Sequence, residues 1–359
     1  MKAFHCEACG SLLFFESVEC VKCHHALGYL PDAKDLSALE PDGQDAWRAL
    51  SLNAKHRRYR LCLNGQQYKV CNWMVPMVDP EPLCRACRLN GVVPDLQVQG
   101  NLGRWHKLEL AKRRVILRLL QLGLPLSGVP SENRTNLEFR FMADSPGQPA
   151  VMSGHAQGVI TLNIAEADDI ERERRRVNLH EPYRTLLGHM RHEIAHFYWD
   201  RLIANSHWTE SFREIFGDER QDYSSALKTH YERGAPNNWQ SSYISSYASA
   251  HPWEDWAETG AHYFHILDLT ETASSFGMAL RPEHPAAQTM TTEPAKPADL
   301  ANFDALIAHW FPLTYALNTL NRDMGLTDLY PFALSDPVVG KLRFAHEVLQ
   351  GAGTKSATI

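Results

Sequence analysis

Apolar side chains recur at helical spacing in several stretches of this chain. Residues 104–122 place Leu108, Val115, Leu119 and Leu122 on one side of a helix. Further helices are predicted through residues 186–197, from Pro252 onward, and near residues 300–323 and 335–350. The chain is therefore expected to be mainly helical after its N-terminal part.

Shorter stretches have the pattern of β-strands. Residues 137–141 alternate between apolar and charged side chains, and residues 158–164 are rich in β-branched ones. They predict a small sheet whose edge strand can pair with an extended peptide. Residues 281–299, rich in Pro, Thr and Ala, predict an extended loop, and residues 351–359 predict a disordered tail.

The cysteines are confined to the N-terminal part, where all 8 lie between Cys6 and Cys87. In a reducing compartment, C-x-x-C pairs indicate metal sites rather than disulfides. Cys6, Cys9, Cys20 and Cys23 have the spacing of a zinc ribbon formed by the first thirty or so residues. Four thiolates leave no open coordination position, so the site is structural, and iron in a rubredoxin-like site is an alternative to zinc.

A second cysteine module of the same kind is predicted over residues 59–95, with Cys62, Cys71, Cys84 and Cys87 as ligands. It contains only one C-x-x-C pair. Two arrangements are therefore compatible with the sequence: a cross-braced pairing of the two cysteine groups, or two separate four-cysteine sites. We favour the two separate sites.

These patterns divide the chain into regions. The ribbon region, residues 1–95, holds a module at 1–30 and another at 59–95. Residues 32–58, with a short helical pattern, are expected to connect the modules. A linker helix within 96–135 then leads to a domain at 136–350.

Charge is unevenly spread over the 359 residues, whose net charge is −6. Residues 1–120 contain 17 Lys or Arg and 12 Asp or Glu, an excess of five positive charges. This excess indicates either contact with nucleic acid or protein, or a solvated helix face, which we favour. The basic residues of the predicted linker helix are Lys107, Lys112, Arg113, Arg114 and Arg118.

Nothing in the sequence indicates a membrane protein. No apolar run approaches the roughly 20 residues that a spanning helix needs. The N-terminus also lacks the apolar segment of a signal peptide. We therefore expect a cytoplasmic protein with reduced thiols and no membrane contact.

The most informative short motif is H-E-x-x-H at residues 192–196, inside an apolar, helix-compatible run. On a helix, His192 and His196 lie on one face and can bind zinc together. Glu193 is then placed to take a proton from a metal-bound water. The simpler alternative is an amphipathic helix whose histidines make ordinary hydrogen bonds and bind no metal. The helix that carries the motif is expected to begin near Pro182.

A catalytic zinc needs a third protein ligand. Asp200 lies one turn beyond His196 and is one candidate. Glu254 and Glu258 are better placed, because they share one face of the predicted helix after Pro252. One carboxylate can bind the metal while the other hydrogen-bonds a ligand histidine. A carboxylate-rich surface stripe is the alternative without a metal.

The E-x-x-A-E pattern, with a tyrosine seven residues ahead, resembles the lethal-factor-type gluzincin proteases. The resemblance implies that Glu254 is the third zinc ligand and that Glu258 supports a ligand histidine. It also implies that Tyr247 stabilises the oxyanion of the tetrahedral intermediate.

Across nearly its whole length, the chain also resembles bacterial zinc-binding metallopeptidases that carry an N-terminal zinc-ribbon domain. The resemblance implies an α+β protein in which the ribbons precede a mainly helical, zincin-like domain with a small β-sheet. Segments 216–220 and 222–223 also match the family pattern, but the sequence does not reveal what these residues do. The other matching segments are the cysteine pairs and residues 71–73, 80–90, 179–184, 192–200 and 253–258.

The sequence therefore predicts a zinc peptidase that acts on a peptide or protein substrate. We expect one catalytic zinc and two structural zinc ions, with Glu193 as the general base. The competing hypothesis is a zinc-ribbon module that binds nucleic acid or protein, attached to a metal-bound domain that cleaves nothing.

Overall fold

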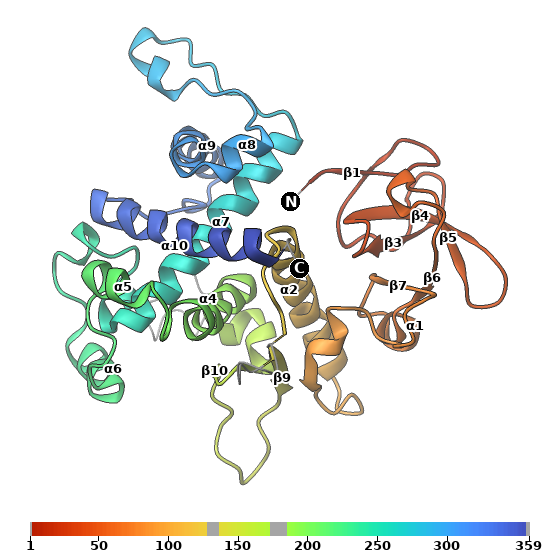
Figure 1. The fold of residues 1–359 in the computed structure, drawn as a ribbon, viewed down its shortest axis with the longest axis horizontal. Coiled ribbons are helices and arrows are strands. Elements are labelled where there is room, and N and C mark those ends of the chain that lie inside the picture. Colours follow the sequence, from red (N-terminus) through yellow and green to blue (C-terminus); the bar gives the residue numbers. More distant parts are fainter. Residues whose placement is uncertain (1, 128–135, 173–184, 357–359) are drawn as a thin grey trace.

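The computed structural model describes residues 2–127, 136–172 and 185–356. Figure 1 shows a β-rich N-terminal part beside a mainly helical C-terminal part, with helix α2 (Asn101–Gln121) between them. The expected α+β class is confirmed. The expected helix start at Pro182 lies outside the described residues.

The N-terminal part is built on a five-stranded antiparallel sheet in the order β3-β4-β5-β6-β7. A hydrogen bond of 2.8 Å from Tyr29 N to Asn72 O links the first strand to the residues just before the last one. The sheet therefore curls towards closure. The elements are β1 Phe4–His5, β2 Leu12–Leu13, β3 Ala26–Leu30, β4 Asp35–Pro41, β5 Trp47–Ala49, β6 Arg58–Leu61, α1 Leu63–Tyr68 and β7 Met74–Pro76.

The expected connector at residues 32–58 is wrong, because this segment supplies strands β4 and β5 and the start of β6. β4 buries both of its faces. Leu36 and Ala38 enter the main core, whereas Leu39 packs in a small cluster with Tyr59. A strand covered on both sides shows no alternation of apolar and polar residues, which hid it in the sequence. The sheet thus combines strands from both predicted modules.

The C-terminal part contains a four-stranded sheet in the order β10-β11-β9-β8. β8, β9 and β11 run parallel to one another, and β10 is an antiparallel edge strand. The elements are β8 Asn90–Val92, β9 Glu138–Met142, β10 Gly154–Ala156, β11 Val159–Asn163, α4 Leu186–Tyr198, α5 Thr209–Phe216, α6 Tyr223–Arg233, α7 Pro252–Ser275, α8 Pro297–Ala301, α9 Phe303–Asp323 and α10 Asp336–Ser356.

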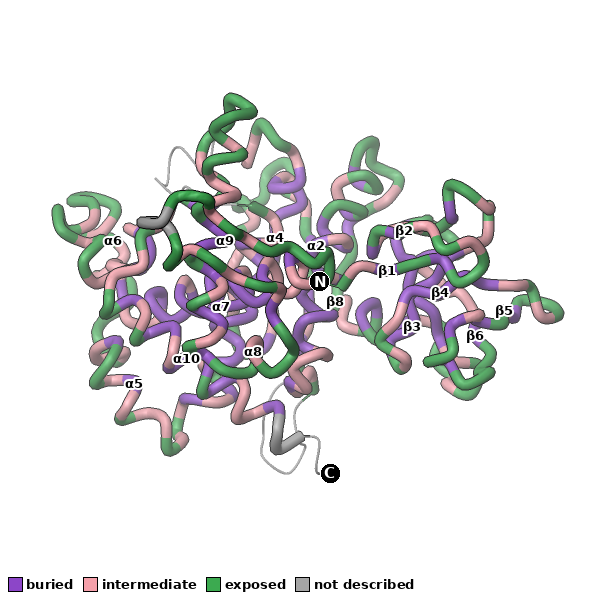
Figure 2. Tube along the Cα trace, turned by 90° about the horizontal axis from the view of Figure 1, so that it is seen from above, coloured by how far each residue is buried: buried purple, intermediate pink, exposed green. Residues whose placement is uncertain are grey.

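Helices α4 and α7 form the centre of this part, and their residues are largely buried (Figure 2). Thr185 caps α4 by accepting a hydrogen bond from Gly188 N at 2.9 Å. The two helices approach closely where Gly260 faces Ala195, because a Cβ on Gly260 would lie 2.7 Å from the Ala195 Cβ. Trp256 fixes the same crossing by donating from Nε1 to Ala195 O at 2.8 Å.

Helix α2 does not have the solvated basic face that we favoured. Lys112 is fully buried and pairs with Glu109 at 2.8 Å. Arg118 reaches Asp268 and Glu271 on α7, at 2.7 and 2.6 Å. The buried basic side chains of α2 therefore hold the helix against neighbouring elements instead of facing water, whereas Lys107 is exposed.

The predicted disordered tail is also wrong as far as the described residues extend, because α10 continues to Ser356. Small residues allow this end of α10 to pack against the end of α2. A Cβ on Gly353 would lie 1.9 Å from Leu122 O, so only glycine fits there. A glycine-rich composition that suggests disorder here serves close packing instead.

Among the described residues, no helix has the length and apolar character needed to cross a lipid bilayer.

Candidate functional site

The two histidines of the H-E-x-x-H motif project from the buried stretch of α4. Their Nε2 atoms, in His192 and His196, are 3.1 Å apart. Glu254 comes from the first turn of α7, a helix capped by the His251 side chain, which accepts from Trp253 N at 3.1 Å. Glu254 Oε2 lies 3.0 Å from His192 Nε2 and 3.5 Å from His196 Nε2.

These three side chains offer the donor set of a zinc site that keeps one position open. One potential ligand atom from each lies within 4.8 Å of the others. Glu254 Oε2 is buried, and no described residue donates a hydrogen bond to it. Two imidazole nitrogens and a carboxylate oxygen around one point fit zinc, which takes these ligands in catalytic sites. Burial favours a neutral Glu254, but His196 and His192 hold the pKa of its carboxyl well below the usual range.

Glu258 lies one turn further along α7 and contacts the other side of the His192 ring. Its Oε1 is 2.7 Å from His192 Nδ1, and its Oε2 accepts from Ser245 Oγ at 2.6 Å. A carboxylate in this position fixes the ring orientation and leaves Nε2 to the metal. The structure thus places Glu258 where the sequence predicted a partner for a ligand histidine.

Asp200, the alternative third ligand, lies in a π-helical turn at Trp199–Ile203. Its Oδ2 is 3.9 Å from His155 Nδ1, and burial raises the pKa of its carboxyl to about 6. In the described part of the chain, the residue that joins His192 and His196 is Glu254, not Asp200.

The remaining predicted residues line a cavity of about 320 Å³ at this cluster. Glu193 faces it from α4. Tyr247, on a 3-10 turn before α7, places its ring 5.9 Å from the His192 ring, measured between centroids. The aromatic residues of the wall are Tyr223, Tyr231, Tyr247, Trp253 and Phe332.

Sequence reasoning missed several groups that contact the site. Tyr223 donates from its phenol to Glu254 Oε1 at 2.6 Å, which gives the previously unexplained segment 222–223 a role. His189 lies 3.0 Å from Glu193 Oε1 through its Nε2. His189 precedes Glu193 by four residues on α4, so helical spacing could have found it. No local pattern signals Tyr223 or Ser245.

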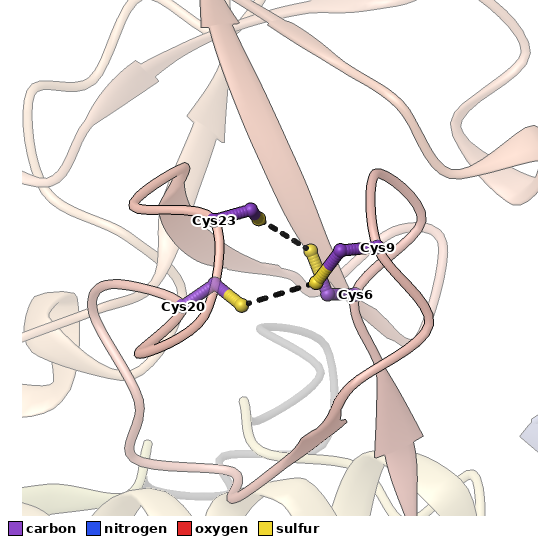
Figure 3. Close-up of side chains that lie close together, drawn as sticks. All are labelled: Cys6, Cys9, Cys20 and Cys23. Carbon is purple, nitrogen blue, oxygen red and sulfur yellow. Dashed lines mark hydrogen bonds between the residues drawn. The ribbon is translucent and has the colours of Figure 1, made fainter.

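The cysteines gather into the two separate groups that we favoured, and the cross-braced arrangement is not formed. Figure 3 shows the sulfurs of Cys6, Cys9, Cys20 and Cys23 converging from two knuckles. The Sγ atoms of Cys6 and Cys23 are 3.5 Å apart, and those of Cys9 and Cys20 are 3.6 Å apart. Zinc–sulfur bonds of about 2.3 Å in a tetrahedron place sulfurs about 3.8 Å apart, so the group fits zinc.

The second cysteine group, Cys62, Cys71, Cys84 and Cys87, is fully buried, whereas Cys9 and Cys23 of the first group are partly exposed. Cys71 and Cys84 have their Sγ atoms 3.7 Å apart. This group lies beside α2, because Cys87 Sγ is 4.0 Å from Glu109 Oε2. It therefore sits at the junction of the two parts of the chain.

Family models match the N-terminal part and the C-terminal part of the chain separately. A family model described as "Putative zinc-binding metallo-peptidase" matches residues 101–348, and a zinc-ribbon domain model matches residues 3–98. No solved structure gives a significant match.

Mycobacterial relatives cover nearly the whole chain. Uncharacterized protein Rv2568c of Mycobacterium tuberculosis (strain H37Rv) is 42% identical over 350 residues, which are 97% of this chain and 95% of that protein. Uncharacterized protein Mb2598c of Mycobacterium bovis matches to the same extent. With a metal-type cluster on α4 and α7 inside the region that the metallopeptidase model matches, this chain belongs to that zinc-binding metallopeptidase family and carries its zinc ribbons in front.

Proposed function

We propose that this protein is a zinc-dependent peptidase whose hydrolytic site is the cluster of His192, His196 and Glu254. One observation carries the proposal. These three ligands converge on one point, and the carboxylate of Glu193 lines the same cavity. A metal site with an adjacent buried base is an arrangement that supports peptide hydrolysis by a metal-activated water.

Zinc at this cluster would lower the pKa of a bound water and polarise the scissile carbonyl. Glu193 accepts a proton from the attacking water as the oxygen–carbon bond forms. It then returns that proton to the leaving amine as the carbon–nitrogen bond breaks. Tyr247 meets the negative charge that develops on the carbonyl oxygen.

The substrate in this proposal is a peptide or protein. The aromatic wall of the cavity favours a large apolar side chain next to the scissile bond. The edge strand β10 contributes Gly154 and His155 to the cavity lining, so an extended peptide can reach the site along it. The cysteine groups would hold two structural zinc ions.

Burial of part of the basic charge of α2 weakens the argument for the binding-module alternative. Residues 1–95 contain equal numbers of basic and acidic residues, so the basic excess of residues 1–120 resides in α2. There, Lys112, Arg113 and Arg118 are buried. They are not available to bind nucleic acid.

The test is the Glu193→Gln variant of the zinc-loaded full chain, with unfolded β-casein as the substrate. We expect zinc content equal to that of the wild type and hydrolysis lowered by about 100-fold or more, since general-base catalysis contributes about 10² to 10⁴. Glu214→Gln, at an exposed position on α5, is the control and should keep full activity. Undiminished hydrolysis by Glu193→Gln would exclude the proposed base.

A further inference from the structure

A chain of hydrogen bonds runs from the start of the edge strand β10 to Glu193. Ser153, just before β10, donates from Oγ to Glu166 Oε1 at 2.5 Å. The other oxygen of Glu166 is 2.7 Å from His189 Nδ1. His189 Nε2 in turn lies 3.0 Å from Glu193 Oε1.

His189 is the central member of this chain, and it lies between two buried carboxylates. Glu166 is 1% exposed and Glu193 is 5% exposed. Two ionised carboxylates away from water need a cation or proton donors between them. An imidazolium meets this need, because both of its ring nitrogens donate.

The charge state of His189 agrees with this geometry. Burial by itself would lower the pKa of His189. The charges of Glu166 and Glu193 and the hydrogen bonds that His189 donates to both carboxylates outweigh burial and raise that pKa to about 9. At neutral pH, His189 is therefore a cation that donates one proton to each neighbour.

The hydrogen bond from His189 makes the two oxygens of Glu193 unequal. Oε1 is held by the imidazolium. No described residue donates a hydrogen bond to Oε2, and Glu193 lines the cavity beside His192 and His196. Oε2 is therefore the oxygen left to accept a proton.

We propose that His189 is the positioning residue of the general base: held by Glu166, it fixes Oε1 of Glu193 and so presents Oε2 to the attacking water. This proposal rests on the proposed peptidase function. In it, Glu166 and Ser153 orient His189 and do not touch the substrate. They also connect the base to the strand along which a peptide would bind.

A purely structural role is the competing explanation, since Glu166 belongs to the 3-10 turn Ile164–Ala167 after β11 and His189 belongs to α4. Loss of that link would lower stability and would not change kcat alone. Replacing His189 by itself would also leave the charge of the buried Glu166 carboxylate without the imidazolium that faces it. The experiment therefore uses the Glu166→Gln background, which carries no such charge.

Three zinc-loaded full-length proteins are compared for cleavage of unfolded β-casein: Glu166→Gln, Glu166→Gln/His189→Leu and Glu166→Gln/His189→Gln. The Leu variant should lose about 10- to 100-fold in kcat, with KM and zinc content unchanged. The Gln variant, whose amide can donate to Glu193, should recover most of the loss. Equal kcat in all three proteins at the wild-type level, or a loss that only follows unfolding or loss of zinc, would overturn the proposal.

A second measurement needs no substrate, so it separates failure of this proposal from failure of the peptidase function. In zinc-loaded protein labelled with ¹⁵N-histidine, His189 should carry protons on both ring nitrogens at pH 7.5. Its signals are assigned by their loss in His189→Gln. A His189 ring whose Nε2 carries no proton at that pH would overturn the proposal, even in a protein that cleaves β-casein.

Discussion

Tyr223 and Glu254 are joined by a hydrogen bond of 2.6 Å from the phenol to Oε1 of the carboxylate. The other oxygen, Oε2, lies 3.0 Å from His192 Nε2. The two oxygens therefore have different partners, and only Oε2 is left for a metal. A carboxylate fixed in this way is expected to bind zinc through one oxygen, since outer partners set the orientation of metal ligands.

Replacing Tyr223 by Phe should therefore weaken zinc binding at this site by about 10-fold, in the range found when such outer partners are removed. Competition with a fluorescent zinc chelator on the full chain measures the change. Tyr247→Phe is the matched control, because it removes a phenol from the same cavity without a contact to Glu254. Equal zinc affinity in the two variants would show that Tyr223 does not hold the ligand.

The sequence predicted the parts of this site whose geometry is local. His192 and His196 are one helical turn apart, and so are Glu254 and Glu258, so helix geometry alone pairs them. The contact from Tyr223 to Glu254 spans 31 positions and depends on how α6 packs beside the 3-10 turn Tyr247–Ala250 that precedes α7. No periodicity encodes such a contact.

The basic residues of α2 also show that a sequence pattern does not reveal distant contacts, and here the pattern led to a wrong prediction. Their spacing is that of an amphipathic helix, which predicts a solvated face. The partners of Arg118 lie 150 and 153 positions away, on α7. A charged side chain that is buried and paired cannot be told from a solvated one until its distant partner is known.

Metal content gives the second prediction. The wild-type chain should bind about three zinc ions, because three groups of residues offer suitable ligands. His192→Ala/His196→Ala should bind about one fewer, and plasma mass spectrometry measures the ratio. About two zinc ions in both proteins would mean that the histidine cluster is empty or weakly held.

The two cysteine groups should release zinc at different rates. Cys9 and Cys23 are partly exposed, whereas the group around Cys71 and Cys84 is fully buried and packs against α2. A chelator can reach the first group without opening the fold, but the second group requires local unfolding. In His192→Ala/His196→Ala, which lacks the zinc of the cavity, excess chelator with a colorimetric readout should therefore show a fast phase that a further Cys9→Ser substitution removes. If a substitution of Cys71 removed the fast phase instead, the fast release would belong to the buried cysteine group, against this prediction.

The final prediction concerns Asp268, which lies between Arg118 and Arg191. Burial alone would raise the pKa of its carboxyl, but the charges of the two guanidinium groups hold this pKa well below its usual range. A native pKa below the unfolded value of about 3.9 stabilises the fold above that pH, and this contribution is lost as pH falls towards the native pKa. Asp268→Asn leaves the buried Arg191 without its charged partner and Arg118 with Glu271 alone. It should lower the free energy of unfolding by about 3 to 5 kcal/mol at pH 7.

Urea denaturation of the wild type and Asp268→Asn between pH 7 and pH 3 tests this prediction. The difference in unfolding free energy between the two proteins should stay constant down to about pH 5 and shrink below about pH 4, because only the wild type has the carboxylate to lose. Zinc release in acid affects both proteins and cancels in the difference. Asp304→Asn removes an exposed ion pair with Arg343 and should change the unfolding free energy little. A difference that grows as pH falls would mean that Asp268 is not held ionised by Arg118 and Arg191.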